Sequence, residues 1–159
     1  MEGVWWSGRW LISTAYPRII IPGLFPDEYF QFALWSIGHG SFNRGSTAWV
    51  VFHHTKTDYL IREASRFAGN DWEIRQAKLP SPSFAGILER LETVSIPLLT
   101  TSEGELEDGS TSGFCLPKGR QVVFVTWSSM PPKEWRSLES WHNQTSGIFR
   151  SLSYAANPR

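Results

Sequence analysis

The alternation of apolar and polar positions predicts β-strands in the first half of the chain. Tyr29–Ile37 alternates between two apolar faces, so we expect a strand that is covered on both sides. A helix over Asp27–Trp35 is the alternative, because Pro26 and two acidic residues fit a first helical turn. Thr47–His54 is a second β-rich segment, and the Gly38–Gly45 loop joins the two segments into a hairpin. One face of the first segment carries Phe30, Phe32 and Leu34, and the other carries Tyr29, Ala33, Trp35 and Ile37.

Further alternating segments extend this hairpin into a meander. Tyr59–Arg66 is a third strand, with a short helix over Tyr59–Phe67 as its alternative. After a turn at Gly69–Asp71, alternation over Trp72–Ala77 predicts a fourth strand. Trp5–Ile12 is a strand or strand pair, followed by an irregular, proline-rich connection to residue 26.

Helical spacing appears twice in the second half of the chain. Ser81, as N-cap, and the following proline predict a helix over 82–95. The stripe from Trp135 to Leu152 predicts a terminal helix over 132–152, which we expect to break or bend at Gly147. Between the helices, Ser110–Leu116 and Gln121–Trp127 form a β-hairpin.

These elements predict an α+β fold: an antiparallel sheet, made of a meander plus a hairpin, packed by helices at about 82–95 and 132–152. The 159 residues fit a single compact domain, 1–159. Nine tryptophans supply large apolar surfaces for its core.

Charge and cysteine content exclude several classes of protein. Lys plus Arg and Asp plus Glu are both 15, and this balance argues against a nucleic-acid partner. Cys115 is the single cysteine, so no internal disulfide can form, and the N-terminal residues do not resemble a secretory signal. We therefore expect a cytoplasmic protein. No apolar run approaches the roughly 20 residues of a membrane span, so no membrane partner is expected.

Titratable residues near glycines are the weak candidates for catalysis. Gly38–Ser41 places His39 and Ser41 in a loop whose glycines allow a ligand to approach the backbone. His53 and His54, at the end of the second strand, are further candidates. No metal-ligand spacing or cofactor motif accompanies them, so we expect neither metal nor cofactor, and the chain is more readily a binding protein than an enzyme.

Two remaining histidine and cysteine positions are interpreted as structural. His142 lies beside Trp141 on the terminal helix and is interpreted as a boundary residue. Cys115, between two apolar neighbours in a predicted strand, is interpreted as a packed small hydrophobe.

Candidate partner-binding residues are the acidic loop and two N-terminal tryptophans. An acidic tip is what an inhibitor of a basic enzyme would present. Two adjacent tryptophans on a strand face opposite sides, so one of them is exposed unless another layer or subunit covers it. The residues are Glu103, Glu105, Glu107 and Asp108 in the loop, and Trp5 and Trp6 near the N-terminus.

The function that these features favour is a small protein-binding module, of the immunity or inhibitor type, that occupies a protein partner. A homodimer is a further expectation. One alternative is a small-molecule-binding protein or hydrolase-like enzyme with an aromatic-lined pocket near the 38–42 loop. Another is a structural subunit of a homo-oligomer.

Overall fold

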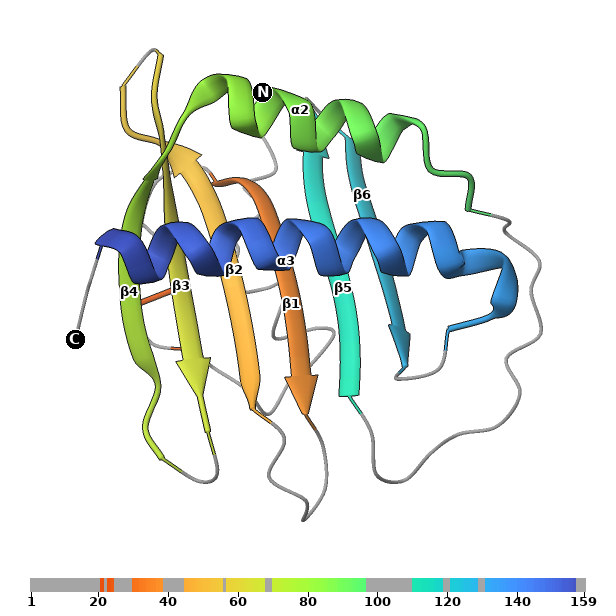
Figure 1. Ribbon diagram of the computed structural model, residues 1–159, viewed down its shortest axis with the longest axis horizontal. Helices are drawn as coiled ribbons and strands as arrows, with labels where there is room; N and C mark the ends of the chain where they lie inside the picture. The colour runs from red at the N-terminus through yellow and green to blue at the C-terminus, as the bar shows by residue number, and fades with distance from the viewer. Residues whose placement is uncertain are drawn as a thin grey trace, which may run out of the picture.

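The computed structural model describes residues 21, 23–24, 30–38, 45–55, 57–67, 70–96, 110–118, 121–128 and 131–156. Within these residues, six strands form one open antiparallel sheet in the order β4-β3-β2-β1-β5-β6 (Figure 1). The strands are β1 (Phe30–Gly38), β2 (Ser46–His53), β3 (Tyr59–Arg66), β4 (Glu73–Leu79), β5 (Ser110–Lys118) and β6 (Gln121–Ser128). The predicted α+β fold, with a meander and a hairpin, is confirmed.

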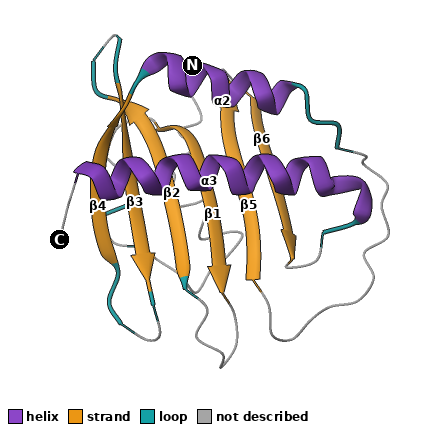
Figure 2. Ribbon diagram, in the orientation of Figure 1, coloured by secondary structure: helices purple, strands orange, loops and turns teal. Residues whose placement is uncertain are grey.

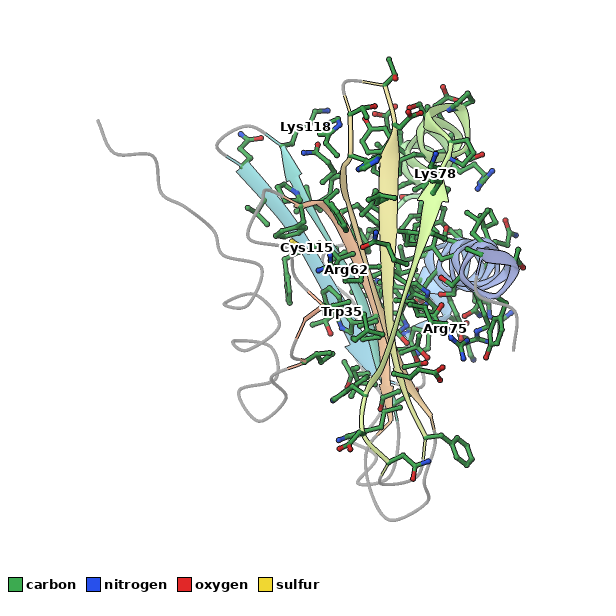
Figure 3. All side chains as sticks on the ribbon, turned by 90° about the vertical axis from the view of Figure 1, so that its left-hand side faces the viewer. Trp35, Arg62, Arg75, Lys78, Cys115 and Lys118 are labelled. Atoms are coloured by element: carbon green, nitrogen blue, oxygen red, sulfur yellow. The ribbon has the colours of Figure 1, made fainter. Side chains whose placement is uncertain are left out.

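Both helices of the described residues cover the same face of the sheet. They are α2 (Ser81–Glu92) and α3 (Arg136–Ala156), and a short 3-10 helix, η1 (Lys133–Trp135), leads into α3 (Figure 2). We call the face beneath them the inner face and the opposite one the outer face. Figure 3 shows the sheet edge-on, with the helices along one side.

Strand β1 occupies the middle of the sheet, between β2 and β5. Its side chains alternate between two buried clusters, with Phe32 and Leu34 on the inner face and Trp35 and Ile37 on the outer face. The prediction of a strand covered on both sides is confirmed, and the alternative helix over Asp27–Trp35 is wrong.

A bulge changes the face of one predicted residue. Phe30 pairs with Phe52, but Phe32 pairs with Val51, so Gln31 is the extra residue on β1. Phe30 therefore belongs to the outer cluster, and its predicted place beside Phe32 is wrong.

The inner core is aromatic and lies between the sheet and the two helices. Phe32 lies at its centre, with ring centroids 6.0 Å from Trp141 and 6.3 Å from both Phe84 and Phe149. Trp141 donates its indole N–H to the carbonyl of Ile87 at 3.1 Å, which ties α3 to α2. These contacts fix both helices against the sheet.

A short turn near the start of the described chain packs on the outer face. The amide of Leu24 donates to the carbonyl of Ile21 at 3.4 Å, and Gly23 between them has a φ of 76°. Only glycine adopts this left-handed conformation without strain. Ile21 and Leu24 both belong to the outer buried cluster.

The ends of the helices differ from the prediction in several ways. The N-cap of α2 is Pro80, which cannot cap through a side chain, and the Ser81 hydroxyl donates instead to the carbonyl of Thr57 in the β2–β3 loop. α2 ends at Glu92, three residues before the predicted end. α3 begins later than predicted and runs without a break through Gly147, because the apolar stripe facing the sheet continues beyond it.

Candidate functional site

Strands β3 and β4 separate their charges between the two faces of the sheet. Glu63 and Glu73 lie on the inner face, where Glu63 bonds Trp49 and Glu73 bonds Arg75. The outer face of the same two strands carries three cations. These are Arg62, Arg66 and Lys78, which alternate with inner-face residues along the strands.

Arg62 is held in position by three neighbours, Gly23, Gln76 and Phe52. Its Nη1 donates to the carbonyl of Gly23 at 2.9 Å, and its Nε and Nη2 donate to Gln76 Oε1 at 3.3 and 3.2 Å. The guanidinium carbon also lies 5.1 Å from the ring centre of Phe52. An arginine has five N–H groups, and two of those of Arg62 have no hydrogen-bond partner among the described residues.

Arg66 and Lys78 lie on the same face as this fixed guanidinium. The Arg66 guanidinium lies 4.9 Å from the ring centre of Trp72, a cation–π arrangement. Lys78 is exposed and pairs across the strands with Leu60, whereas Ile74 pairs with Ala64 and is 39% exposed. We call the set Arg62, Arg66, Trp72, Ile74 and Lys78 the outer corner.

The two acidic residues of β3 and β4 lie on the inner face, where Glu63 is buried and Glu73 is exposed. Glu63 is 2% exposed, and its Oε2 accepts a hydrogen bond from Trp49 Nε1 at 2.8 Å. Arg75 pairs with Glu73 at 2.8 Å and lies 4.3 Å from the ring centre of Tyr154 at the end of α3 (Figure 3). Hydrogen bonds to Tyr154 and then to Glu73 raise the pKa of Arg75, which keeps its charge in the fold. These charges are therefore not presented to the outer face.

His142 lies inside the protein, so its interpretation as a boundary residue is wrong. It is 3% exposed, its Nε2 donates to the carbonyl of Trp35 at 2.9 Å, and its ring stands edge-on to Trp127. Burial lowers the pKa of His142, although the hydrogen bond to Trp35 acts in the opposite direction. The neutral form is therefore favoured in the fold.

Cys115 is fully buried on the outer face of β5, as predicted for a packed small hydrophobe (Figure 3). Burial raises the pKa of its thiol to about 12. The thiolate, which is the reactive form, is strongly disfavoured there.

Of the predicted histidine candidates, His53 and His54 lie at one end of the β1–β2 hairpin. His53 ends β2, where its ring lies 4.6 Å from that of Tyr59, and the exposed His54 follows it. Gly38 and Ser46, which flank the loop with His39 and Ser41, lie at the other end, seven residues or about 23 Å along the strand. His39 and Ser41 themselves lie outside the described residues.

The other predicted partner-binding residues also lie outside the described residues. They are Glu103, Glu105, Glu107, Asp108, Trp5 and Trp6. Of the six tryptophans that are described, Trp35, Trp49, Trp127 and Trp141 are buried, which supports the prediction that tryptophans build the core.

Within the part of the chain that is described, no cluster of three or more His, Cys, Asp or Glu residues could hold a metal ion. No described helix combines the length and the apolar character needed to cross a bilayer.

The sequence predictions missed the outer corner, although its signal is present in the sequence. Arg62 and Arg66 are four residues apart on a strand, so they share a face that Glu63 does not. The net charge of zero hides this separation because it sums both faces. What the pattern cannot supply is the contact of Arg62 with Gly23, 39 residues away in the chain.

The fold and site thus define an α+β domain with a cationic corner on the sheet face opposite its two described helices. No family model matches the chain, and no curated protein matches it. Among solved structures, the crystal structures of MRP1/MRP2 from Trypanosoma bruciei match with 16% identity over 77% of this chain and 87% of that chain. The TM-score is 0.25, so this likeness supports no conclusion about the chain.

Proposed function

We propose that this chain is a protein-binding module that holds an acidic segment of its partner on the outer corner. An inhibitor or immunity protein, which occupies its partner rather than converting a substrate, is the concrete form of this proposal. The observation that carries it is the Arg62 guanidinium, which is fixed by three hydrogen bonds and an aromatic ring and keeps two donors for a partner.

A fixed arginine lowers the cost of binding. An exposed arginine loses side-chain entropy when a partner immobilises it, on the order of 0.5–1.5 kcal/mol. Arg62 is already ordered by Gly23, Gln76 and Phe52 before any partner arrives. Arginine and tryptophan are also the residues that contribute most often to binding hot spots, and the corner combines both types.

The charge of the corner favours an acidic partner. Three cations share the outer face of β3 and β4, whereas the carboxylates of Glu63 and Glu73 on these strands lie on the inner face. A carboxylate can accept both remaining N–H groups of Arg62 in a bidentate pair. The exposed side chain of Ile74 offers an apolar contact beside it.

A protein partner fits the corner better than a nucleic acid. Binding to a phosphate backbone depends on many cations, and here three cations stand in a chain of zero net charge. Stacking of bases requires an open aromatic face, but the Arg66 guanidinium already covers one face of Trp72.

The proposal is tested by an NMR titration of the ¹⁵N-labelled full chain with an octapeptide of alternating Glu and Gly. We expect shifts at the Arg62 side-chain N–H and the Trp72 indole N–H, and we expect them to shrink as salt screens the charges. Arg66→Glu combined with Lys78→Glu should abolish the shifts. Lys118→Glu is the matched control, because it also reverses an exposed strand cation but lies on β5.

Two results would contradict the proposal. One is a peptide response that persists in the double variant, which would locate the acidic ligand elsewhere. The other is a stronger response of the same signals to an oligothymidine of 15 nucleotides, which would favour a nucleic-acid ligand.

A further inference from the structure

The described sheet has two edges, and they differ in charge. An edge strand exposes a row of unpaired backbone N–H and C=O groups, which natural proteins usually protect with charged side chains. β4 follows this rule with Glu73, Arg75 and Lys78. β6, at the other edge, contains no charged residue over Gln121–Ser128.

This uncharged edge strand of the described sheet also exposes apolar side chains. Val123 is 45% exposed and Phe124 is 37% exposed, and the two residues face opposite sides of the sheet. Strand-forming residues dominate the segment, so its edge is well suited to pair with another strand.

The sequence of β6 is complementary to itself in the antiparallel direction. Phe124 is flanked by Val123 and Val125, and beyond them by Val122 and Thr126, which have nearly the same shape. A two-fold axis beside Phe124 would place Phe124 opposite Phe124, and Val123 opposite Val125, of a second copy. The two residues of each such pair lie on the same face of the sheet, and no pair brings like charges together.

The position of Phe124 is set by the strands behind it. Trp35 on β1 lies over Gly113 on β5, and its ring centre is 5.4 Å from that of Phe124. Phe124 is therefore supported on the outer face before any second copy binds.

We propose that β6 is the dimerisation strand of this protein, and that two copies join edge to edge, with Phe124 at the two-fold axis, into a continuous antiparallel sheet. The interface uses the opposite edge of the sheet from the outer corner, so it does not depend on the proposed function. A symmetric contact of this kind closes after two copies, because each β6 edge is then paired.

Sedimentation velocity of the full chain between about 1 and 200 μM tests the proposal at concentrations where weak dimers are detected. We expect a dimer whose dissociation constant rises about a hundredfold or more in Phe124→Lys, since two like charges then meet at the axis. Ile74→Lys is the matched control: it places lysine at a similarly exposed position, 39% against 37%, on the other edge strand. The control should dimerise like the native chain.

Cysteine cross-linking tests the register and remains informative if Phe124→Lys fails to fold. Directly opposed residues of antiparallel strands have Cα atoms about 4.5–5.5 Å apart, which a disulfide can bridge. Under oxidation, Phe124→Cys should form a covalent dimer, whereas Val123→Cys should not, because its partner is Val125. Cys115 is fully buried and does not compete.

Three results would overturn the proposal: a monomer at every concentration, a dimer that survives Phe124→Lys in a folded protein, and equal cross-linking at both positions. A complex of one copy with a different protein that is lost in Phe124→Lys would also overturn it, in favour of a foreign strand. None of these results bears on the Glu–Gly peptide titration, so the two proposals fail separately.

Discussion

The same substitution, glycine to alanine, is expected to change stability in opposite directions at two positions. At Gly113, an ideal Cβ would lie 2.5 Å from Trp35 Cζ2 and 2.6 Å from the carbonyl oxygen of Val125. At Gly147, apart from its own stretch of helix backbone, no atom of the described residues lies within 4 Å of the corresponding Cβ. Gly113→Ala should therefore destabilise the protein, and Gly147→Ala should stabilise it.

The magnitudes follow from these surroundings. Overpacking in a core costs about 1–3 kcal/mol, and we expect Gly113→Ala to cost about 3 kcal/mol, because one clashing atom belongs to the backbone of a paired strand and cannot rotate away. Gly147 lies at an exposed position inside α3, where alanine is favoured over glycine by about 0.5–1 kcal/mol. The two variants should differ by about 4 kcal/mol, from these two estimates.

Urea unfolding followed by circular dichroism measures both free energies of unfolding. The free energy of unfolding falls by about 1–3 kcal/mol per molar urea. Gly113→Ala should therefore lower the urea midpoint by about 1 M or more, and Gly147→Ala should raise it by a few tenths of a molar unit. A Gly113→Ala protein with native stability would refute the packing of Trp35 over β5. A destabilised Gly147→Ala protein would refute the open surroundings of α3.

Three further predictions concern buried polar groups. Burial lowers the pKa of His142 in the fold, so its contribution to stability is complete above the unfolded pKa near 6.5 and declines as the pH falls below it, by up to about 1.4 kcal/mol per pH unit. Between pH 7 and pH 5, the unfolding free energy of His142→Gln should therefore fall less steeply than that of the native protein. Parallel plots of unfolding free energy against pH for the two proteins would contradict this. Trp49→Phe removes the donor to the buried Glu63 carboxylate and should lower the free energy of unfolding by about 1–3 kcal/mol, measured by chemical unfolding. In a protein that already carries Glu63→Gln, the same substitution should cost less. An equal cost in both backgrounds would argue against the hydrogen bond between Trp49 and Glu63. The Cys115 thiol, with its pKa of about 12, should react with a thiol reagent at pH 8 only after the protein unfolds, and rapid labelling of the native protein would show that β5 opens.

Strand positions could be predicted because side-chain direction repeats every two residues, and the sequences of β1 to β4 show this repeat. It fails locally at Gln31, since a bulge adds a residue without changing the composition of the segment. It also does not tell which face the helices cover. Phe32 and Ile37 are both fully buried, although they lie on opposite faces of the sheet.

The helical details depended on contacts that the sequence does not display. Ser81 is a suitable N-cap by residue type, but its hydroxyl donates a hydrogen bond to the carbonyl of Thr57, 24 residues earlier in the chain. Gly147 predicted a break, yet packing of α3 on the sheet offsets the modest cost of one glycine. His142 is polar at the edge of an apolar stripe, and its burial depends on the carbonyl of Trp35 as a hydrogen-bond acceptor.

Native mass spectrometry of the tagged protein, purified gently from its own host, would show whether the outer corner holds an acidic protein partner. We expect a stoichiometric second protein that carries an acidic segment, stays bound to the Lys118→Glu variant and is lost from the Arg66→Glu, Lys78→Glu double variant. A second protein that stays bound to this double variant, or a bound small molecule or nucleic acid in its place, would show that the outer corner does not hold an acidic protein.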